Sequence, residues 1–473
     1  MFLFKYIQNY KNNIALISDE TGAITYNQLT QCINKIKKKI PERSLIFLIS
    51  ENSIASIISY IFSIKNNCVA MLVDIKTNKD EISNLINSYK PSFICASKQW
   101  MENYSDNNFK AFESLYEYSF YRTKYNISPL MHKDLSLLLP TSGSMGSPKF
   151  VRISKDNLKS NANSIIKYLN IKSSQRSITN MPFNYSYMLS IINTYLESGA
   201  SIYISKYSII QKNFWEEFLK YKITSLSGVP YIFEMLIKLG LKKLPLNNLK
   251  ILTHAGGKLD IDSAKIIIKF CGENKIKFFS MYGQTEASPR MTYLDWKVAS
   301  KKIGSIGKAI PNTEIWLENE NGEKIKNSNE IGELIFSGRN VSMGYSNNLK
   351  DLKKDDENKG VLKTGDFACF DDEGYFYIKG RKKRITKLFG NRFNLDEIEE
   401  KMKKLKFEVF CKDVNDRLYI FFDKDFNSKD VLNKVSKITG QNKIAFSCIK
   451  LKQLPRTSSG KVDYLKLNIN AKL

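Results

Sequence analysis

Short apolar runs that end in turn residues alternate with helical patterns through the first 370 residues of this 473-residue chain. The runs "SLIFLIS" (44–50), "KILTHAGG" (250–257) and "IKFFSMYG" (276–283) predict buried strands. The patterns "IASIISYIFSIKNN" (54–67) and "VPYIFEMLIKLG" (229–240) predict helices. Such alternation predicts an α/β architecture with largely parallel sheets. A chain of this length also exceeds a single ordinary core, so we expect more than one domain.

The last third of the chain changes character. From about Ile303 the expected strands come closer together, and Asn321-Gly322 predicts a hairpin turn within a small β-rich subdomain. Beyond the basic cluster "GRKKRITK", Asn394 and Glu397 predict the capped start of a helix in a small α+β module. The predicted division is an N-terminal domain at residues 1–380, a hinge at 381–384 and a C-terminal domain at 385–473.

Composition indicates a globular protein of a reducing compartment. Hydrophobic residues make up 42% and charged residues 25% of the chain, close to ordinary globular usage. The N-terminal "MFLFKYIQNYKNN" has no long apolar core, and the apolar stretches are too short to span a bilayer. Seven cysteines without a C-x-x-C pair, and only two histidines, disfavour a disulfide framework and a zinc site. We therefore expect a cytoplasmic location.

The net charge of +26 raises the possibility of nucleic-acid binding. Lysine is over-used together with Asn, Ile, Phe and Tyr, the bias expected of AT-rich coding, and the basic residues are dispersed. No RNA-binding or helix-turn-helix signature accompanies them. Nucleic acid is therefore disfavoured, and attraction to polyphosphates or to an acidic carrier protein is the more useful consequence of the charge.

The stretch "LLLPTSGSMGSPKFVRIS" (137–154) places a glycine- and hydroxyl-rich loop after an apolar run. Such a loop offers backbone N–H groups, hydroxyls and one ammonium, which together suit a phosphate. It is not a P-loop, because Gly143 and Gly146 are only three positions apart and Phe150 follows Lys149. A plain surface loop of small residues remains the alternative reading of this stretch alone.

Four more polar clusters stand at expected strand ends or near the C-terminus: "THAGGK", "YGQTEAS", "KTGD" and "PRTSSGK". Together, in this order and spacing, the five clusters resemble the adenylate-forming superfamily of acyl-CoA synthetases, luciferases and peptide-synthetase adenylation domains. The resemblance runs from Ile24 to Asp463. It implies a large N-terminal domain of stacked α/β subdomains, with the small β-rich subdomain, and a small mobile α+β C-terminal lid.

The activity implied is the ATP-dependent activation of a carboxylic acid as an acyl-adenylate, with release of pyrophosphate. A thiol, of CoA or of a phosphopantetheine on an acyl carrier protein, then displaces AMP. The implied cofactors are ATP and Mg²⁺, and the chemistry asks mainly for positioning and charge neutralisation. Two alternatives stay open: an adenylating enzyme with a non-thiol acceptor, and a catalytically silent binding module of the same fold.

The resemblance also assigns roles to residues. The glycine- and hydroxyl-rich loop would bind the phosphates of ATP, through Thr141, Ser142, Gly143, Ser144, Gly146 and Lys149. Met145 departs from the family, which usually carries a hydroxyl residue at that position. In "YGQTEAS", Tyr282 would stack on adenine beside Gly283, Thr285 would contact the α-phosphate, and Glu286 would ligate Mg²⁺.

Further roles lie along the chain. Gly256 and Gly257 would line the adenine and acyl pocket, while His254 beside them receives no role. Asp366 and Arg381 would bind the ribose. Lys383 is the implied hinge residue, and Lys461 would bridge the substrate carboxylate and the α-phosphate.

The acid itself is described only by its class. In "MPFNYSYMLS", Tyr185 matches the gate residue beside the carboxylate site. Amino-acid-activating members place an aspartate in this region, but no acidic residue lies between Met181 and Ser190. An unpaired buried ammonium would be costly, so a non-amino acid is favoured.

Overall fold

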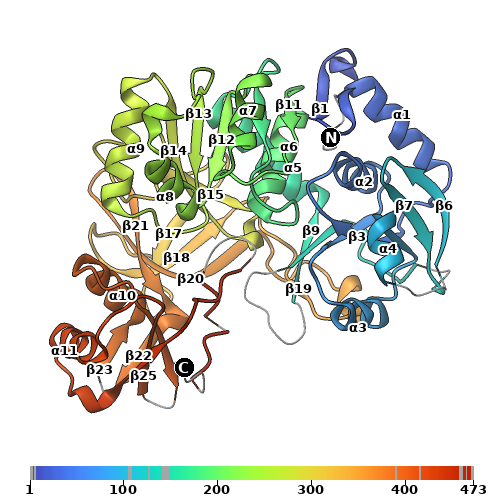
Figure 1. Cartoon of the computed structure of the whole chain (residues 1–473). Helices are drawn as coiled ribbons and strands as arrows, with labels where there is room; N and C mark the ends of the chain where they lie inside the picture. The colour runs from blue at the N-terminus through green and yellow to red at the C-terminus, as the bar shows by residue number, and fades with distance from the viewer. Residues whose placement is uncertain are drawn as a thin grey trace. The chain divides into compact units, whose positions relative to one another are not determined.

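The computed structural model describes residues 4, 7–104, 109–125, 128–140, 149–388, 391–414, 417–457, 462–464 and 466–469. The chain divides into two compact units (Figure 1). Unit 1 comprises Met1–Glu314 with Ser337–Leu362, and unit 2 comprises Ile315–Phe336 with Lys363–Leu473. The division at 381–384 that we expect from the sequence stays a prediction.

One sheet of unit 1 has nine strands among the described residues, and its centre is parallel. In spatial order the strands are β16 (Lys308–Ala309), β15 (Arg290–Leu294), β14 (Lys277–Gly283), β13 (Ile251–His254), β12 (Ser225–Gly228), β10 (Arg176–Ile178), β11 (Ser201–Tyr203), β1 (Ile14–Ser18) and β2 (Gly22–Thr25). The edge strands β2, β15 and β16 are antiparallel to their neighbours.

The second sheet of unit 1 has eight strands within the described part of the chain. Their order is β19 (Tyr345–Ser346), β9 (Phe150–Ser154), β8 (Leu135–Pro140), β4 (Val69–Asp74), β3 (Leu45–Ser50), β5 (Phe93–Ser97), β7 (Tyr118–Arg122) and β6 (Lys110–Leu115). Strands β8, β4, β3 and β5 are parallel. Every residue of β3 is buried, as expected of a central parallel strand.

Helices α2 (Ile54–Lys65), α5 (Lys155–Leu169) and α6 (Ser186–Glu197) form the layer between these sheets. Helix α2 contacts β1 of one sheet and β3 of the other, while α5 packs on β9 and on α6, which in turn packs on β11. This placement explains why Ile54–Ile64 and Ser186–Leu196 are buried all round. Some of their polar side chains form hydrogen bonds between the two helices, as when Tyr60 of α2 donates to Asn193 of α6 at 3.0 Å.

The helix starts follow the local sequence signals. Ser53 caps α2 and Ser154 caps α5, each accepting a hydrogen bond from a backbone N–H in the first turn. The other α-helices of unit 1 are α1 (Tyr26–Lys37), α3 (Lys79–Tyr89), α4 (Lys98–Tyr104), α7 (Lys212–Lys220), α8 (Pro230–Leu239) and α9 (Ile261–Glu273). Its short 3₁₀ helices are η1 (Ile7–Tyr10), η2 (Leu241–Lys243), η3 (Thr285–Ala287) and η4 (Leu349–Lys353).

Unit 2 begins with a sheet that carries the predicted turn. The order is β17 (Glu314–Glu318), β18 (Gly332–Ser337), β20 (Val361–Phe370) and β21 (Phe376–Arg381). The chain reverses after β17 at Asn321–Gly322, where Gly322 has φ +81° and Glu318 pairs with Lys324. The positive φ explains why glycine stands there, and the predicted hairpin turn is confirmed.

The rest of unit 2 is the predicted α+β module. It contains η5 (Lys382–Arg384), β22 (Ile385–Leu388), β23 (Asn391–Asn394), α10 (Leu395–Lys404), β24 (Phe410–Val414), β25 (Arg417–Phe422), α11 (Ser428–Thr439), η6 (Lys443–Ala445) and β26 (Phe446–Lys450). Helices α10 and α11 bury apolar side chains such as Met402 and Val431 in one core with β25. Asn394 caps α10 as expected, but its side chain accepts from the backbone N–H of Asp396 and not from that of Glu397.

The fold class expected from the sequence is confirmed. The observed architecture is the mixed α/β fold that the strand–helix alternation predicts. Among the helices of the described residues, none combines the length and the apolar character needed to cross a membrane. All seven cysteines are free thiols.

Candidate nucleotide and acid site

The glycine- and hydroxyl-rich loop connects two antiparallel strands of unit 1. Strand β8 ends at Pro140 and β9 begins at Phe150, and these two residues are paired. The predicted phosphate ligands Thr141, Ser142, Gly143, Ser144 and Gly146, together with Met145, lie outside the described residues. Lys149, which directly precedes β9, belongs to the described residues.

Lys149 and Glu286 both contact Tyr345, one at the face of its ring and the other at its hydroxyl. The ammonium nitrogen of Lys149 lies 3.5 Å from the centroid of the Tyr345 ring, a cation–π contact. The hydroxyl of Tyr345 donates a 2.8 Å hydrogen bond to Oε1 of Glu286. Burial and the Glu286 charge both raise the pKa of Tyr345, so its hydroxyl stays protonated and remains a donor. Tyr345 thereby fixes one carboxylate oxygen of Glu286, the predicted Mg²⁺ ligand.

The backbone around Glu286 is held as well. Glu286 lies in η3, directly after β14, and its carbonyl oxygen accepts from the N–H of Ser342 at 2.8 Å. The hydroxyl of Thr285 is 3.1 Å from that of Ser186, at the start of α6. Thr285 and Glu286 are therefore adjacent to the first turn of α6 and to the end of the β14 strand.

Tyr282 and Gly283 form the end of β14, where the strand pairs with β15. Gln284 donates to the hydroxyl of Tyr282 at 3.3 Å. A Cβ on Gly283 would overlap the carbonyl oxygen of Pro289, so close backbone approach already requires glycine here. This packing requirement is separate from the room for adenine that the resemblance implies.

Gly256 and Gly257 follow β13 and face bulky neighbours. Gly256 has φ +87°, and a Cβ there would overlap the hydroxyl of Tyr185. A Cβ on Gly257 would lie 3.0 Å from the ring of Pro230. The structure thus brings the predicted gate residue Tyr185 against the predicted pocket residue Gly256. Burial raises the pKa of Tyr185 to about 12, so its phenol is neutral near pH 7.

His254, to which the sequence assigns no role, is a buried neutral residue at the end of β13. Its side chain is 2% exposed, and burial lowers its pKa to about 3. Nδ1 lies 3.2 Å from the hydroxyl of Ser280, while Nε2 is buried without a hydrogen-bond partner in the described structure.

Asp366 and Arg381 face each other across β20 and β21 of unit 2. They are paired in register, and Nε of Arg381 lies 3.2 Å from Oδ1 of Asp366. The Asp366 side chain is 4% exposed and that of Arg381 is 62% exposed. The two predicted ribose ligands are therefore brought together.

The two lysines that the resemblance assigns to the lid stay untested. The backbone of Lys383 belongs to η5, but its side chain and the whole of Lys461 lie outside the described part of the chain. Arg384, the last residue of the expected hinge, forms ion pairs with Asp396 and Glu399, and Tyr464 donates to Glu399 at 2.7 Å.

Sequence reasoning missed three residues of unit 1. Tyr345 carries only a weak signal, a glycine–tyrosine pair after the strand "GELIFSG". Ser186 lies inside the gate segment, where a serine carries no signal of its own. Arg290 follows "YGQTEAS" by one proline, and its burial to 2% exposure could not be read from a basic residue in a basic chain.

The donor set suits Mg²⁺ bound together with a nucleotide. Within the described residues there is no group of three or more His, Cys, Asp and Glu side chains that could hold a metal ion. Mg²⁺ usually takes only one or two carboxylates from the protein and completes its shell with phosphates and water. The single carboxylate of Glu286, oriented by Tyr345, is consistent with this coordination preference.

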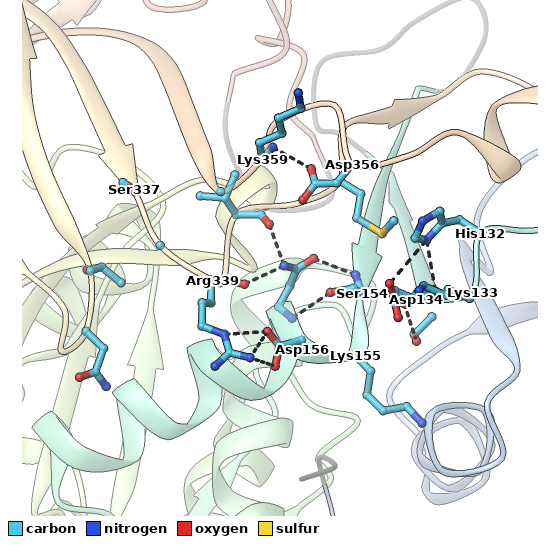
Figure 2. A pocket seen from close by; sticks show the side chains of 18 of the residues that line it. His132, Lys133, Asp134, Ser154, Lys155, Asp156, Ser337, Arg339, Asp356 and Lys359 are labelled. Carbon is cyan, nitrogen blue, oxygen red and sulfur yellow. Dashed lines mark hydrogen bonds and ion pairs between the residues drawn. The ribbon is translucent and has the colours of Figure 1, made fainter.

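A separate cavity of about 980 Å³ in unit 1 holds none of the predicted site residues (Figure 2). At its wall, Arg339 forms an ion pair with Asp156. Arg43 donates to the carbonyl oxygens of His132 and Leu135. We therefore place the candidate site at the ends of β13 and β14 and not in this cavity.

Comparison with known proteins identifies the family of this chain. A family model described as AMP-binding enzyme matches residues 3–346. The chain is 24% identical to the D-alanine–D-alanyl carrier protein ligase of Bacillus licheniformis, over 98% of this chain and 97% of the relative. It is 23% identical to the 2-succinylbenzoate–CoA ligase of Staphylococcus epidermidis, over 97% and 95% of the two chains.

A solved structure gives the same picture of the fold. The O-succinylbenzoate coenzyme A synthetase of Bacillus subtilis, in complex with AMP, matches with a TM-score of 0.78 over 100% of this chain and 99% of that one, at 19% identity. This likeness confirms the predicted fold, with a large N-terminal domain and a smaller C-terminal one. Because the family model spans most of the sequence, the chain belongs to the AMP-binding enzyme family.

Proposed function

We propose that this protein is an AMP-forming acid–thiol ligase. It activates a carboxylic acid with ATP, releases pyrophosphate and transfers the acyl group from the adenylate to a thiol. Its relatives are named as ligases of acids to CoA or to a carrier protein, which supports this reaction class. The observation that carries the proposal is the Lys149–Tyr345–Glu286 contact, because it joins a cation and an oriented carboxylate beside the phosphate-type loop.

Within this proposal, Glu286 holds Mg²⁺ and Tyr345 keeps its carboxylate in one orientation. When bound, the ion supplies positive charge that offsets the negative charge of the ATP phosphates. The presence of ATP and a magnesium ion in a solved structure of the Bacillus subtilis relative supports this cofactor pair. Lys149 steadies the loop at residues 141–148, whose hydroxyl and glycine residues bind the pyrophosphate side of ATP.

The remaining roles follow the resemblance. Tyr282 binds adenine, Thr285 contacts the α-phosphate, and Asp366 with Arg381 binds the ribose hydroxyls. A carboxylate that is already bonded to a cation accepts hydrogen bonds from a diol without a change in its own charge. Lys461 stabilises the charge that develops between the acid and the α-phosphate.

The acid is a non-amino acid in this proposal. A bound ammonium would need a carboxylate partner, and none lies on the segment from Met181 to Ser190. The guanidinium of Arg290 stands 3.9 Å from the centroid of the Tyr187 ring, on the same segment, and would repel an ammonium. One relative is named as a ligase of D-alanine, which is an amino acid. The restriction to non-amino acids is therefore proposed for this chain and not for its relatives.

The acceptor thiol belongs to CoA or to an acyl carrier protein, and the reaction takes place in the cytoplasm. Acyl carrier proteins of acidic character would be steered by a net charge of +26. Loading of a carrier should then slow steeply as salt is added, because screening shortens the range of the attraction. Loading that is insensitive to salt, together with efficient use of free CoA, would contradict the carrier protein as acceptor.

The experiment that tests the function is pyrophosphate release from Mg²⁺-ATP across a panel of carboxylic acids, with CoA present or absent. We expect acid-dependent release without CoA in a single turnover and multiple turnover when the correct thiol is added. No acid-dependent release with any acid would contradict the proposed function, and full turnover without a thiol would favour the non-thiol acceptor.

A further inference from the structure

Arg290 is a buried cation that forms no ion pair with a carboxylate of the described residues. Its side chain is 2% exposed, at the start of β15. The guanidinium donates to Sδ of Met281 at 3.1 Å and to the hydroxyl of Ser190 at 3.0 Å. Its Nε has no hydrogen-bond partner, and no described carboxylate forms an ion pair with it. A thioether sulfur and one hydroxyl are weak partners for a group with five N–H donors.

The neighbouring tyrosines do not supply the missing charge. The ring of Tyr187 lies under the guanidinium, and its own hydroxyl bonds to Thr253. Burial raises the pKa values of Tyr185, Tyr187 and Tyr168, so all three phenols are neutral near pH 7. A buried charge is strongly unfavourable unless it is paired and hydrogen-bonded. The cation is therefore incompletely compensated in the protein alone.

The position of Arg290 connects it to the candidate site. Arg290 is paired with Gly283 across β15 and β14, one residue from Tyr282. Its guanidinium rests on Tyr187, whose ring centroid is 6.3 Å from that of the gate residue Tyr185. Ser190 lies one helical turn from Ser186, which contacts Thr285. The guanidinium therefore contacts Tyr187 and Ser190 in the first half of α6, the helix that begins directly after the gate residue Tyr185.

We infer that Arg290 selects the acid and that the substrate carries a second anionic group, most simply a second carboxylate, which pairs with this guanidinium. The inference rests on the proposed function and names the substrate class of the same site. The open Nε and the weakly bonded Nη atoms offer the adjacent donors that a carboxylate accepts in a bidentate pair. The first carboxylate is left for attack on ATP.

The test compares each dicarboxylic acid with its own monoamide, which keeps the length and removes one charge. The series runs from oxalate to adipate and includes phthalate, and the readout is kcat/KM for pyrophosphate release. The best diacid should exceed its monoamide by about 100-fold, the size expected when one partner of a buried charge pair is removed. A neutral keto or hydroxy acid that matches the best diacid would overturn the inference.

The variant Arg290→Met removes the charge and keeps an unbranched apolar side chain. The ratio of kcat/KM between the diacid and its monoamide should fall by about 100-fold in this variant, since the ion pair is lost. Arg176→Met is the matched control. Arg176 is a half-buried arginine of β10 that donates to Ser201 and to the carbonyl of Tyr221, away from this cluster. That control should keep the wild-type preference. An equal loss with all acids in Arg290→Met would overturn the inference.

A binding measurement separates this inference from the proposed function. Replacing an uncompensated buried charge by an apolar residue is often neutral or stabilising, so Arg290→Met should keep the wild-type Tm or exceed it. The best diacid should raise the Tm of the wild type and of Arg176→Met but not that of Arg290→Met. If this pattern holds while no acid releases pyrophosphate, the inference stands and the proposed ligase function falls. If no diacid shifts the Tm and none reacts, both fall.

Discussion

The hydroxyl of Tyr345 donates to the carboxylate of Glu286 at 2.8 Å. Tyr345 lies in β19, which pairs with β9 at the end of the glycine- and hydroxyl-rich loop, whereas Glu286 follows β14 of the other sheet. One hydrogen bond therefore links the two sheets of unit 1 at the point where the phosphates and the metal are proposed to bind. A carboxylate held in this way keeps its second oxygen, Oε2, for a cation.

Replacing Tyr345 by Phe should weaken the use of Mg²⁺ without removing the aromatic contact with Lys149. We expect the Mg²⁺ concentration that gives half-maximal adenylation to rise about tenfold, within the range seen when a hydrogen bond to a metal ligand is lost. The measurement is acid-dependent pyrophosphate release as a function of Mg²⁺ at saturating ATP and acid.

Two further variants complete this comparison. Glu286→Gln should lower adenylation by about 100-fold or more, as expected when a group that stabilises the transition state is lost. Tyr377→Phe removes a similar hydrogen bond, of 3.1 Å to Asp371 in unit 2, and should leave the Mg²⁺ dependence unchanged. Wild-type rates in Glu286→Gln would show that this carboxylate does not hold the metal.

The Asp366–Arg381 pair yields a prediction about the sugar of the nucleotide. If Asp366 accepts the ribose hydroxyls, Asp366→Asn should raise the KM for ATP about tenfold or more, the usual effect of losing a hydrogen bond to a charged group. The wild type should also discriminate against 2′-deoxy-ATP and 3′-deoxy-ATP, and Asp366→Asn should lose much of that discrimination.

Asp371→Asn is the control for the ribose prediction. Asp371 belongs to the turn between the same two strands, where it accepts from the backbone N–H groups of Glu373 and Tyr375. Its replacement perturbs the same hairpin but leaves the Asp366–Arg381 pair in place. If Asp366→Asn discriminates between ATP and the deoxynucleotides as strongly as the wild type, the ribose assignment is wrong.

Most of the fold could be predicted because the spacing of apolar residues and the turn and capping residues at the ends of the segments determine local structure. The runs at 44–50 and 250–257 are strands β3 and β13, and the pattern at 54–67 contains α2 with its Ser53 cap. What the sequence did not reveal is that α2 and α6 are buried on every side between two sheets. Serine and tyrosine residues make these helices look partly polar in the sequence. Their burial depends on hydrogen bonds between residues distant in the chain, such as the one from Tyr60 to Asn193, which the sequence pattern does not indicate.

The residues of the candidate site that stand in short sequence motifs could be predicted, whereas those that reach the site only through packing could not. Glu286, Thr285 and Lys149 stand in short polar clusters at strand ends, and the structure brings Lys149 and Glu286 to one tyrosine. Tyr345 and Arg290 come from β19 and β15, which have no polar cluster of their own. Their importance depends on burial and on partners distant in sequence, which single-residue patterns do not encode.

His254 predicts a pH dependence of stability. The unfolded chain binds a proton at the ordinary pKa of 6.5, whereas the folded protein keeps His254 neutral down to about pH 3 because of burial. The stabilisation is therefore complete above pH 6.5 and is lost as the pH falls toward 3. The free energy of unfolding should decrease by up to about 1.4 kcal/mol per pH unit in this window from His254 alone.

The variant His254→Gln keeps a hydrogen-bonding group near Ser280 and removes the titration. Urea unfolding at pH 7 and pH 5 should show a smaller loss of stability in this variant than in the wild type. His132→Gln, at the only other histidine, should retain the loss that His254 causes. An acid-induced loss of the same size in His254→Gln and the wild type would contradict the prediction.

The last prediction concerns the division of labour in the proposed lid at residues 385–473. The family resemblance implies one lid orientation for adenylation, with Lys461 inserted, and another that opens a route for the thiol. Lys461→Ala should therefore lower acyl-adenylate formation by about 100-fold or more, because the charge on the reacting groups loses its stabiliser. The same variant should still consume a supplied acyl-adenylate when CoA or a carrier protein is added.

Lys383→Pro should have the opposite effect. Proline fixes φ and stiffens the proposed hinge, so adenylation should survive while thioester formation slows. The two half-reactions are followed separately in single-turnover experiments on the full chain, with Lys382→Ala as the neighbouring control, because Lys382 forms an exposed ion pair with Glu333 that should contribute little. Equal damage to both half-reactions by Lys461→Ala and Lys383→Pro would show that the lid does not separate the two steps. Opposite damage would assign adenylation to Lys461 and the change of orientation to the hinge.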